Sequence, residues 1–230
     1  LEFRRVLFRS GTVSGFMLAP VTRRTWTAHS RARRGIRRGC LLMFPDQGTR
    51  LTRLRAVEVH EQGPRLVLVG PMGAGKSTVG RLVATALDVP FLDSDAEIER
   101  EAGQAIPEIF AEKGEKHFRA LEERVIARLL AEHDGVLALG GGAVTTPLTR
   151  ARLIHAPVVR LVLDPAHAKK RIGNGKGRPV LAGEDPLARW IKVSREREPF
   201  FAEVSTWALD TNDISPEDLA STLVRELCRR

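Results

Sequence analysis

The chain has 230 residues, which is enough for one large domain or for one domain with an extension. Its formal charge of +9 resembles that of a nucleic-acid-binding protein, but residues 1–64 alone hold 13 arginines and only four acidic residues. Residues 65–230 hold 24 basic and 24 acidic residues, so the charge of this larger part is balanced. The charge therefore gives no reason to expect nucleic acid as a partner.

Cysteine content and apolar runs argue against two further classes of protein. Cys40 and Cys228 are the only cysteines, so neither a disulfide framework nor a cysteine-based metal site is supported. The six histidines show no metal-ligand spacing. No run approaches the ~18–20 apolar residues that span a bilayer. We therefore expect a cytoplasmic protein in a reducing compartment, without a membrane partner.

Residues 1–62 form an arginine-rich segment with no sustained helical or strand period. It has three interpretations: a cloning scar or translated upstream sequence, with Met17 or Met43 as the true start; an organellar transit peptide, which would place the protein in an organelle; or a basic nucleic-acid-binding arm. We favour the first, because such a composition arises easily and the segment lacks interleaved aromatic residues. The predicted organisation is therefore an extension over 1–62, disordered or not native coding sequence, and one domain over 63–230.

From residue 65 onward, short apolar runs alternate with stretches of helical periodicity. The runs that predict strands are RLVLVG (65–70), PFLD (90–93), GVLAL (135–139), PVVRLVLD (157–164) and TWALDT (206–211). Helices are predicted over 76–88, 96–103, 106–114, 115–133, 147–155, 165–172, 186–204 and 215–230. The helix over 186–204 is expected to be interrupted at Pro199, and Ser215 is expected to cap the last helix. Apolar strands that alternate with helices predict an α/β fold with a parallel sheet covered on both faces.

The stretch GPMGAGKST follows the first predicted strand and opens the first predicted helix. It matches the pattern G-x-x-x-x-G-K-[ST], in which glycines turn backbone N–H groups toward an anion at a helix N-terminus. A glycine-rich linking turn is the alternative, but the strand, loop and helix order favours binding of a nucleoside triphosphate. The residues predicted to contact it are Gly73, Ala74, Gly75, Lys76, Ser77 and Thr78.

Two aspartates, Asp93 and Asp95, follow the second predicted strand. In an open α/β sheet, ligands bind beyond the carboxyl ends of the strands, so these residues are candidates for chemistry. One carboxylate could hold a hydrated Mg²⁺, and the other could accept a proton from an acceptor hydroxyl. The spacing of Ser94 and Glu97 also fits a capping box, and on spacing alone the two interpretations are equally good.

Six stretches together resemble shikimate kinase in their order and spacing: GPMGAGKSTVGRLVATAL, FLDSDAEIE, IPEIFAEKGEKHFRALEERVI, LALGGGAV, GRPVL and REREPFFAEV. The resemblance covers about residues 65–228. It implies a three-layer P-loop kinase fold with a five-stranded parallel sheet, helices on both faces and a mobile lid. It also implies transfer of the γ-phosphate of ATP to the 3-hydroxyl of shikimate with Mg²⁺, and we expect a monomer.

On the acceptor side, the resemblance implies that Asp95 engages the shikimate hydroxyls and is the candidate base. Arg119 and Arg197 match the arginines that pair with the shikimate carboxylate, and Glu122 would hold Arg119. Taken alone, each arginine would be assigned to a solvated surface, and only the ordered set of motifs favours a binding role. The resemblance also implies that three glycines let the substrate approach the backbone: Gly140, Gly141 and Gly142.

On the nucleotide side, the resemblance implies that Ser77 and Asp93 hold Mg²⁺, Asp93 through water. Lys76 would contact phosphate, and Arg178 would close over the phosphates as part of the lid. Arg171 lies where the family stacks a cation on adenine. Lys76 and Arg178, with Asp95 as base, would make up the catalytic group.

The sequence also departs from the family pattern. The chain has no tyrosine, so Phe200 and Phe201 stand where a tyrosine is common, and Asp213 stands where an arginine near adenine is common. The second departure puts the affinity and selectivity for the base in question. Two other functions therefore stay open: another small-molecule kinase, such as a gluconate kinase, and a nucleotide-dependent binding protein without phosphotransfer.

Overall fold

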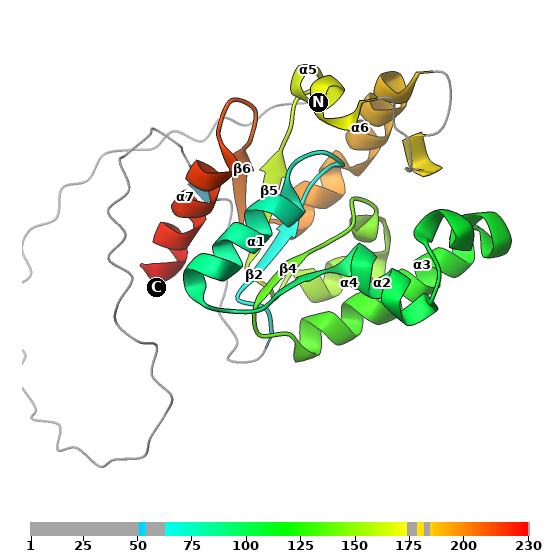
Figure 1. The fold of residues 1–230 in the computed structure, drawn as a ribbon, viewed down its shortest axis with the longest axis horizontal. Helices are drawn as coiled ribbons and strands as arrows, with labels where there is room; N and C mark the ends of the chain where they lie inside the picture. Colours follow the sequence, from blue (N-terminus) through cyan, green and yellow to red (C-terminus); the bar gives the residue numbers. More distant parts are fainter. Residues whose placement is uncertain (1–50, 54–62, 174–178, 182–184, 230) are drawn as a thin grey trace, which may run out of the picture. The chain divides into compact units, whose positions relative to one another are not determined.

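The described residues, 51–53, 63–173, 179–181 and 185–229 of the computed structural model, form a six-stranded sheet with helices on both faces (Figure 1). The strand order is β1-β6-β5-β2-β4-β3. Five of the strands are parallel, as the resemblance implied. The strand bounds are β1 Leu51–Arg53, β2 Leu66–Val69, β3 Phe91–Asp93, β4 Val136–Ala138, β5 Val158–Val162 and β6 Trp207–Asp210.

The sixth strand, β1, was not predicted. It pairs antiparallel with β6, with Leu51 opposite Leu209 and Arg53 opposite Trp207. It lies within the segment assigned to the extension, so part of that segment contributes to the sheet. Three residues are too few to show a strand period, so periodicity does not identify this strand.

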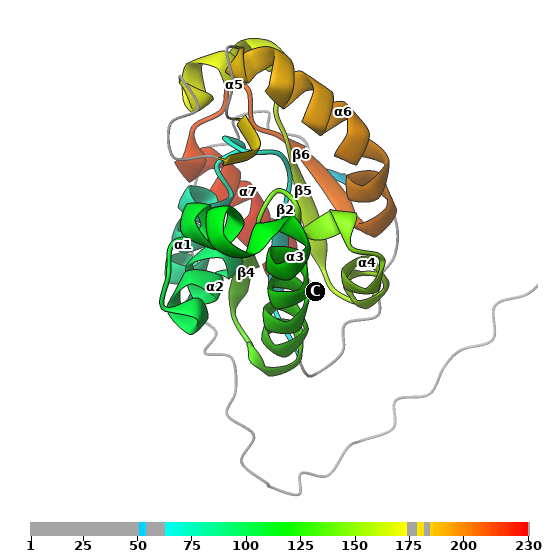
Figure 2. The same ribbon diagram turned by 90° about the vertical axis from the view of Figure 1, so that its right-hand side faces the viewer.

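Helices cover both faces of the sheet (Figure 2), and an apolar core lies on each face. On one face α1 and α7 cover Leu66 and Leu68 of β2, and on the other α3 and α4 cover Val67 and Val69. Because alternate residues of β2 point to opposite faces and all four are buried, this strand is apolar throughout, as in a central parallel strand. The helix bounds are α1 Lys76–Leu87, α2 Ser94–Ala102, α3 Ile106–Glu132, α4 Pro147–Leu153, α5 Pro165–Ile172, α6 Pro186–Val204 and α7 Pro216–Cys228.

Three details of the helices differ from the prediction. The helices predicted over 106–114 and 115–133 form one element, α3, which is kinked at Gly114, where φ is 75°. Helix α6 runs through Pro199 without a break. The capping box of Ser94 and Glu97 was wrong, because Asp93 is the N-cap residue of α2 and accepts a hydrogen bond from the Asp95 backbone N–H. Ser215 caps α7 as predicted.

The parallel strands all end at the same edge of the sheet, and the segments that follow them meet there. The segment after β2 is the glycine-rich loop, and β3 ends at Asp93. The three glycines follow β4, Asp164 follows β5, and Thr211 follows β6. The topology therefore brings three sets of predicted site residues to this edge: the glycine-rich loop, the two aspartates and the three glycines.

Candidate active site

The loop between β2 and α1 needs glycine at several positions. Gly70 has a φ of 144°, and a Cβ atom there would lie 2.4 Å from the backbone oxygen of Leu161. Gly73 and Gly75 also have positive φ, at 82° and 88°. Gly75 is the N-cap of α1 and has no side chain to cap it, so the first N–H groups of the helix are directed at the loop. The loop is therefore built to surround an anion with backbone donors.

Lys76 lies over this loop. Its ammonium donates hydrogen bonds to the backbone oxygens of Gly70 and Pro71, both at 3.0 Å. The loop is also held from α6, because the Trp190 indole N–H donates to the Met72 oxygen at 2.9 Å. These contacts place a positive charge beside the N-terminus of α1, where phosphate would bind.

Asp93 makes a different contact with each of its carboxylate oxygens. Oδ2 accepts a hydrogen bond from the Ser77 hydroxyl at 2.5 Å, and Oδ1 accepts from the Asp95 N–H at 3.0 Å. Hydroxyl and carboxylate oxygens suit Mg²⁺. Within the described ranges no three His, Cys, Asp or Glu residues are grouped so as to hold a metal. This pair fits an ion that takes its other ligands from phosphate and water.

Asp95 points toward the three glycines that follow β4. A Cβ atom at Gly140 would lie 2.3 Å from Asp95 Oδ1, so the carboxylate occupies space that only glycine leaves. The Gly140 N–H donates to the Ser94 hydroxyl at 2.9 Å, which ties α2 to this turn. Burial, and then the charge of Asp93 and of Glu122, raises the pKa of Asp95 to about 6. A carboxylate with a raised pKa binds a proton more readily, as a general base must.

Two arginines from different helices meet beside Asp95. Arg119 of α3 donates to Glu122 at 2.6 Å, and this glutamate is only 2% exposed. Arg197 of α6 donates to the Gly141 oxygen at 2.9 Å. Burial, and then the positive charge of Arg119, lowers the pKa of Arg197. Such a pair of forked cations suits a carboxylate.

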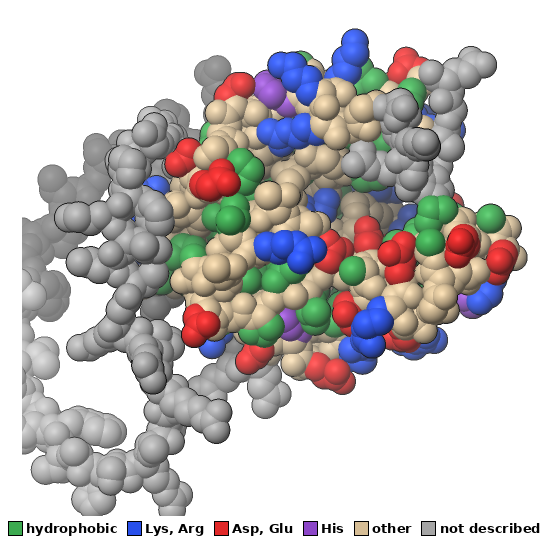
Figure 3. All heavy atoms as spheres, in the orientation of Figure 1, with side chains coloured by type: hydrophobic (Ala, Val, Ile, Leu, Met, Phe, Trp, Pro, Cys, Tyr) green, Lys and Arg blue, Asp and Glu red, His purple; other side chains and the backbone are tan. Residues whose placement is uncertain are grey.

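Gly142 completes the acceptor side of the site. A Cβ atom there would lie 2.4 Å from Arg119 Nη1. The predicted acceptor residues are thus brought into direct contact: each glycine touches either Asp95 or one of the two arginines. Figure 3 shows this face of the molecule hollowed between the half of the domain with α5 and α6 and the half with α3, with basic and acidic side chains in the hollow.

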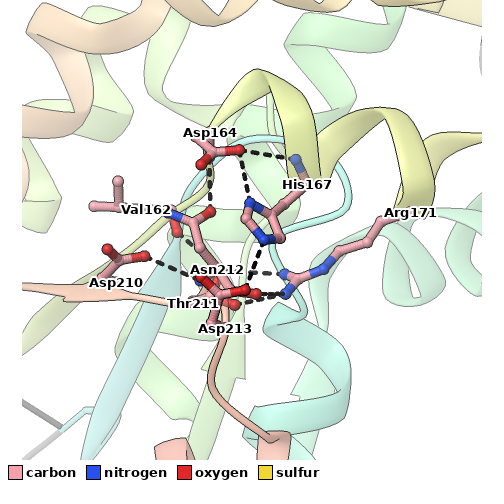
Figure 4. Close-up of polar contacts among 8 residues, drawn as sticks. All are labelled: Val162, Asp164, His167, Arg171, Asp210, Thr211, Asn212 and Asp213. Carbon is pink, nitrogen blue, oxygen red and sulfur yellow. Dashed lines mark hydrogen bonds and ion pairs between the residues drawn. The ribbon is translucent and has the colours of Figure 1, made fainter.

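Arg171 lies farther along the same edge (Figure 4). Its guanidinium donates to the Thr211 oxygen at 2.5 Å, to the Thr211 hydroxyl at 3.2 Å and to the Asn212 oxygen at 3.1 Å. Asp213, in the same loop, contacts the His167 ring at 2.9 Å. The predicted lid residue Arg178 lies outside the described residues.

Sequence reasoning missed two residues at this edge, His167 and Trp190. The contact between His167 and Asp213 joins residues 46 apart, and that between Trp190 and Met72 joins residues 118 apart. Only the Asp164-Pro-Ala-His167 spacing gave a local signal, since Asp164 caps α5 by accepting from the His167 N–H.

Comparison with known proteins adds to this geometry. The shikimate kinase family model matches residues 72–228. The chain belongs to the shikimate kinase family. It is 48% identical over 164 residues to a shikimate kinase from Saccharopolyspora erythraea, which covers 71% of this chain and 94% of that protein. It is likewise 48% identical to a shikimate kinase from Thermobifida fusca, over 71% of this chain and 95% of that protein.

A solved shikimate kinase has the same fold. The shikimate kinase from Acinetobacter baumannii, solved in complex with shikimate, superposes with a TM-score of 0.70 and is 38% identical. The match covers 74% of this chain and 94% of that one. In the described part of our chain, no helix is both long and apolar enough to cross a bilayer.

Proposed function

We propose that the protein transfers the γ-phosphate of ATP to the 3-hydroxyl of shikimate, a step in the synthesis of chorismate and the aromatic amino acids. One observation carries the proposal: a phosphate-binding loop, a half-buried carboxylate and two arginines from separate helices share one edge of the sheet. Membership of the shikimate kinase family supports it. The Acinetobacter baumannii relative, solved with shikimate, supports the choice of acceptor.

Arg119 and Arg197 bind the carboxylate of the acceptor in this proposal. Both are held by hydrogen bonds before the acceptor arrives, Arg119 by Glu122 and Arg197 by the Gly141 oxygen. Binding therefore costs little side-chain entropy. Gly140 and Gly142 leave the space that the Asp95 carboxylate and the Arg119 guanidinium occupy, so both groups can face the acceptor. Because gluconate also carries a carboxylate, the two arginines alone do not distinguish shikimate from gluconate.

The nucleotide occupies the loop and the neighbouring turn. The backbone N–H groups at the start of α1 and the Lys76 ammonium bind the phosphates, through Gly73, Ala74, Gly75, Lys76, Ser77 and Thr78. Arg171, held by the loop after β6, offers the face of its guanidinium to adenine. Arg178, to which the resemblance assigns a contact with the phosphates, lies outside the described residues.

Ser77 and Asp93 would hold Mg²⁺, as their hydroxyl and carboxylate oxygens fit this ion. When bound, it would supply positive charge that offsets the charge of the nucleotide phosphates. The chain holds the Ser77 hydroxyl oxygen, at the start of α1, 2.5 Å from a carboxylate oxygen of Asp93, at the end of β3. The loop after β2 positions Ser77, and the cap of α2 positions Asp93.

Phosphoryl transfer then proceeds by direct displacement. The 3-hydroxyl oxygen forms a bond to the γ-phosphorus, the bond from that phosphorus to the β,γ-bridging oxygen breaks, and ADP leaves with the electron pair. The hydroxyl proton goes to a carboxylate oxygen of Asp95. Lys76 stabilises the charge that develops on the phosphoryl oxygens.

We further propose a cytoplasmic monomer that acts without a nucleic-acid or membrane partner.

Product formation tests the proposal directly. ADP release is measured with the full chain, Mg-ATP and shikimate, gluconate or no acceptor, and the product is identified by phosphorus NMR. We expect turnover with shikimate alone, with phosphate on the 3-oxygen. Turnover with shikimate no faster than without an acceptor would overturn the proposal, and a preference for gluconate would assign the other kinase function.

A further inference from the structure

His167 connects two loops at the nucleotide end of the sheet, and nothing in the proposed function uses it. It lies in the first turn of α5, and Figure 4 shows its ring between two carboxylates from different segments. Nδ1 is 2.9 Å from Oδ1 of Asp164, and Nε2 is 2.9 Å from Oδ1 of Asp213. Asp164 precedes α5, whereas Asp213 belongs to the loop between β6 and α7.

The chemistry of imidazole fixes the charge that this arrangement needs. A neutral ring has one N–H and one acceptor nitrogen, so it can donate to only one of two carboxylates. Both nitrogens donate only in the imidazolium form. The hydrogen bond to Asp164, and then that to Asp213, raises the pKa of His167. The other charged groups on the two segments are Lys169, Lys170, Arg171 and Asp210.

The same loop holds Arg171, one helical turn after His167. The Arg171 guanidinium donates to the Thr211 and Asn212 oxygens, and the Asn212 side chain accepts from the Asp164 N–H at 2.9 Å. Helix α5 and its N-cap therefore bind the loop at three points, of which His167 is the one with a titratable bond. The position of the Arg171 guanidinium depends on where this loop lies.

We propose that His167 is a positioning residue for ATP, which as an imidazolium fixes the loop after β6 against α5 and so fixes the Arg171 guanidinium for the base. The proposal rests on the role of Arg171 proposed above. His167 acts through Arg171 and does not touch the reacting atoms, so it affects nucleotide binding and leaves the chemical step unchanged.

The sign of the pH dependence follows from the bridge. A group whose folded pKa is raised contributes fully below its unfolded pKa, and the contribution is lost as pH rises through the folded pKa. The bridge is thus intact on the acid side and opens on the alkaline side of a pKa above the ordinary value of about 6.5. Affinity for the nucleotide base should fall as pH rises across this range.

The experiment compares two ligands, ADP and inorganic tripolyphosphate, by calorimetry from pH 6 to 9 on the full chain. Tripolyphosphate reports on the phosphate loop alone. The dissociation constant of ADP divided by that of tripolyphosphate therefore measures the contribution of the base to binding. For His167→Gln at pH 6.5 we expect ADP to bind about three- to fivefold more weakly, with tripolyphosphate unchanged. The ratio should become independent of pH. Asp213→Asn should act in the same way, and His155→Gln, in the turn after α4, is the matched control.

Arg171→Ala separates the two proposals. If Arg171→Ala leaves the ratio unchanged, the role of Arg171 is wrong, and the inference about His167 falls with it. If Arg171→Ala raises the ratio but His167→Gln does not, only the inference about His167 is overturned. In the double variant with both His167→Gln and Arg171→Ala, non-additive effects support the action of His167 through Arg171. Additive effects refute it. The comparison supports the proposal only where the unfolding curve of each variant matches that of the wild type.

Discussion

A methyl group added at Gly142 should displace Arg119 and weaken acceptor binding without unfolding the protein. The Cβ atom would lie 2.4 Å from Arg119 Nη1 and 2.9 Å from Cζ, whereas ordinary contacts begin at 3.4 Å. The backbone tolerates alanine, because Gly142 has φ −98° and ψ −12°. The atom that must move is the end of a flexible side chain, so the strain is relieved by a shift of the guanidinium by about 1 Å.

The size of the effect follows from that shift. Hydrogen bonds to charged groups contribute about 1.5–3 kcal/mol, and a misplacement of ~1 Å costs up to about 100-fold in rate. We therefore expect Gly142→Ala to lower kcat/KM for shikimate by about 10- to 100-fold, mainly through KM. KM for ATP should change by less than about twofold, because the loop after β2 is untouched. The free energy of unfolding should fall by only about 1 kcal/mol or less.

Steady-state kinetics with each substrate varied, together with urea unfolding, measure these quantities. Gly141→Ala is the comparator, since its Cβ atom would meet no other atom closer than 3.6 Å, and it should have a much smaller effect on KM for shikimate. The reasoning is refuted if Gly142→Ala binds shikimate as wild type does, or if its stability falls by several kcal/mol, which would mean that the backbone moved instead of Arg119.

Three further variants test other parts of the site. Asp95→Asn should lower kcat by about 10²–10⁴-fold, whereas Asp88→Asn, at the left-handed C-cap of α1, should keep turnover; equal effects in the ADP-release assay would remove Asp95 as the base. Ser77→Ala should raise the Mg²⁺ concentration needed for half-maximal activity, and an unchanged magnesium titration would contradict the assigned ligand. Gly70→Ala should cost about 1–3 kcal/mol in denaturant unfolding, because its Cβ would lie 2.4 Å from the Leu161 oxygen at a φ of 144°; wild-type stability would contradict that clash.

Most of the parallel sheet could be predicted because its strands are apolar on both faces. Val67 and Leu68 of β2 are fully buried on opposite sides, so an uninterrupted apolar run identifies the strand. Periodicity failed where an element is short or where a local rule is overridden. Strand β1 has three residues, and Pro199 stays inside α6 although a proline usually breaks a helix.

The glycine-rich loop, the two aspartates and the three glycines could be predicted to lie together because each follows a strand, whereas Arg119 and Arg197 lie on helices and were assigned only through the resemblance. The Asp93 to Asp95 pair also shows why two interpretations of one stretch were both reasonable. Asp93 caps α2 with one oxygen and contacts Ser77 with the other, so capping and the proposed metal binding share one carboxylate. What the motif could not give was the identity of the cap, since Ser94 instead accepts from Gly140, which lies 46 residues away.

The contact between Asp213 and His167 gives a different interpretation of the departure from the family pattern at position 213. In sequence, an aspartate where an arginine near adenine is common suggests a negative charge facing the nucleotide. In the structure that carboxylate contacts the ring of His167, and Asp164 contacts the other side. With His167 as an imidazolium, the Asp213 carboxylate is paired with a cation from α5, and Arg171 of the same helix remains the cation proposed for the base. This pairing is titratable, whereas a guanidinium at position 213 would stay charged.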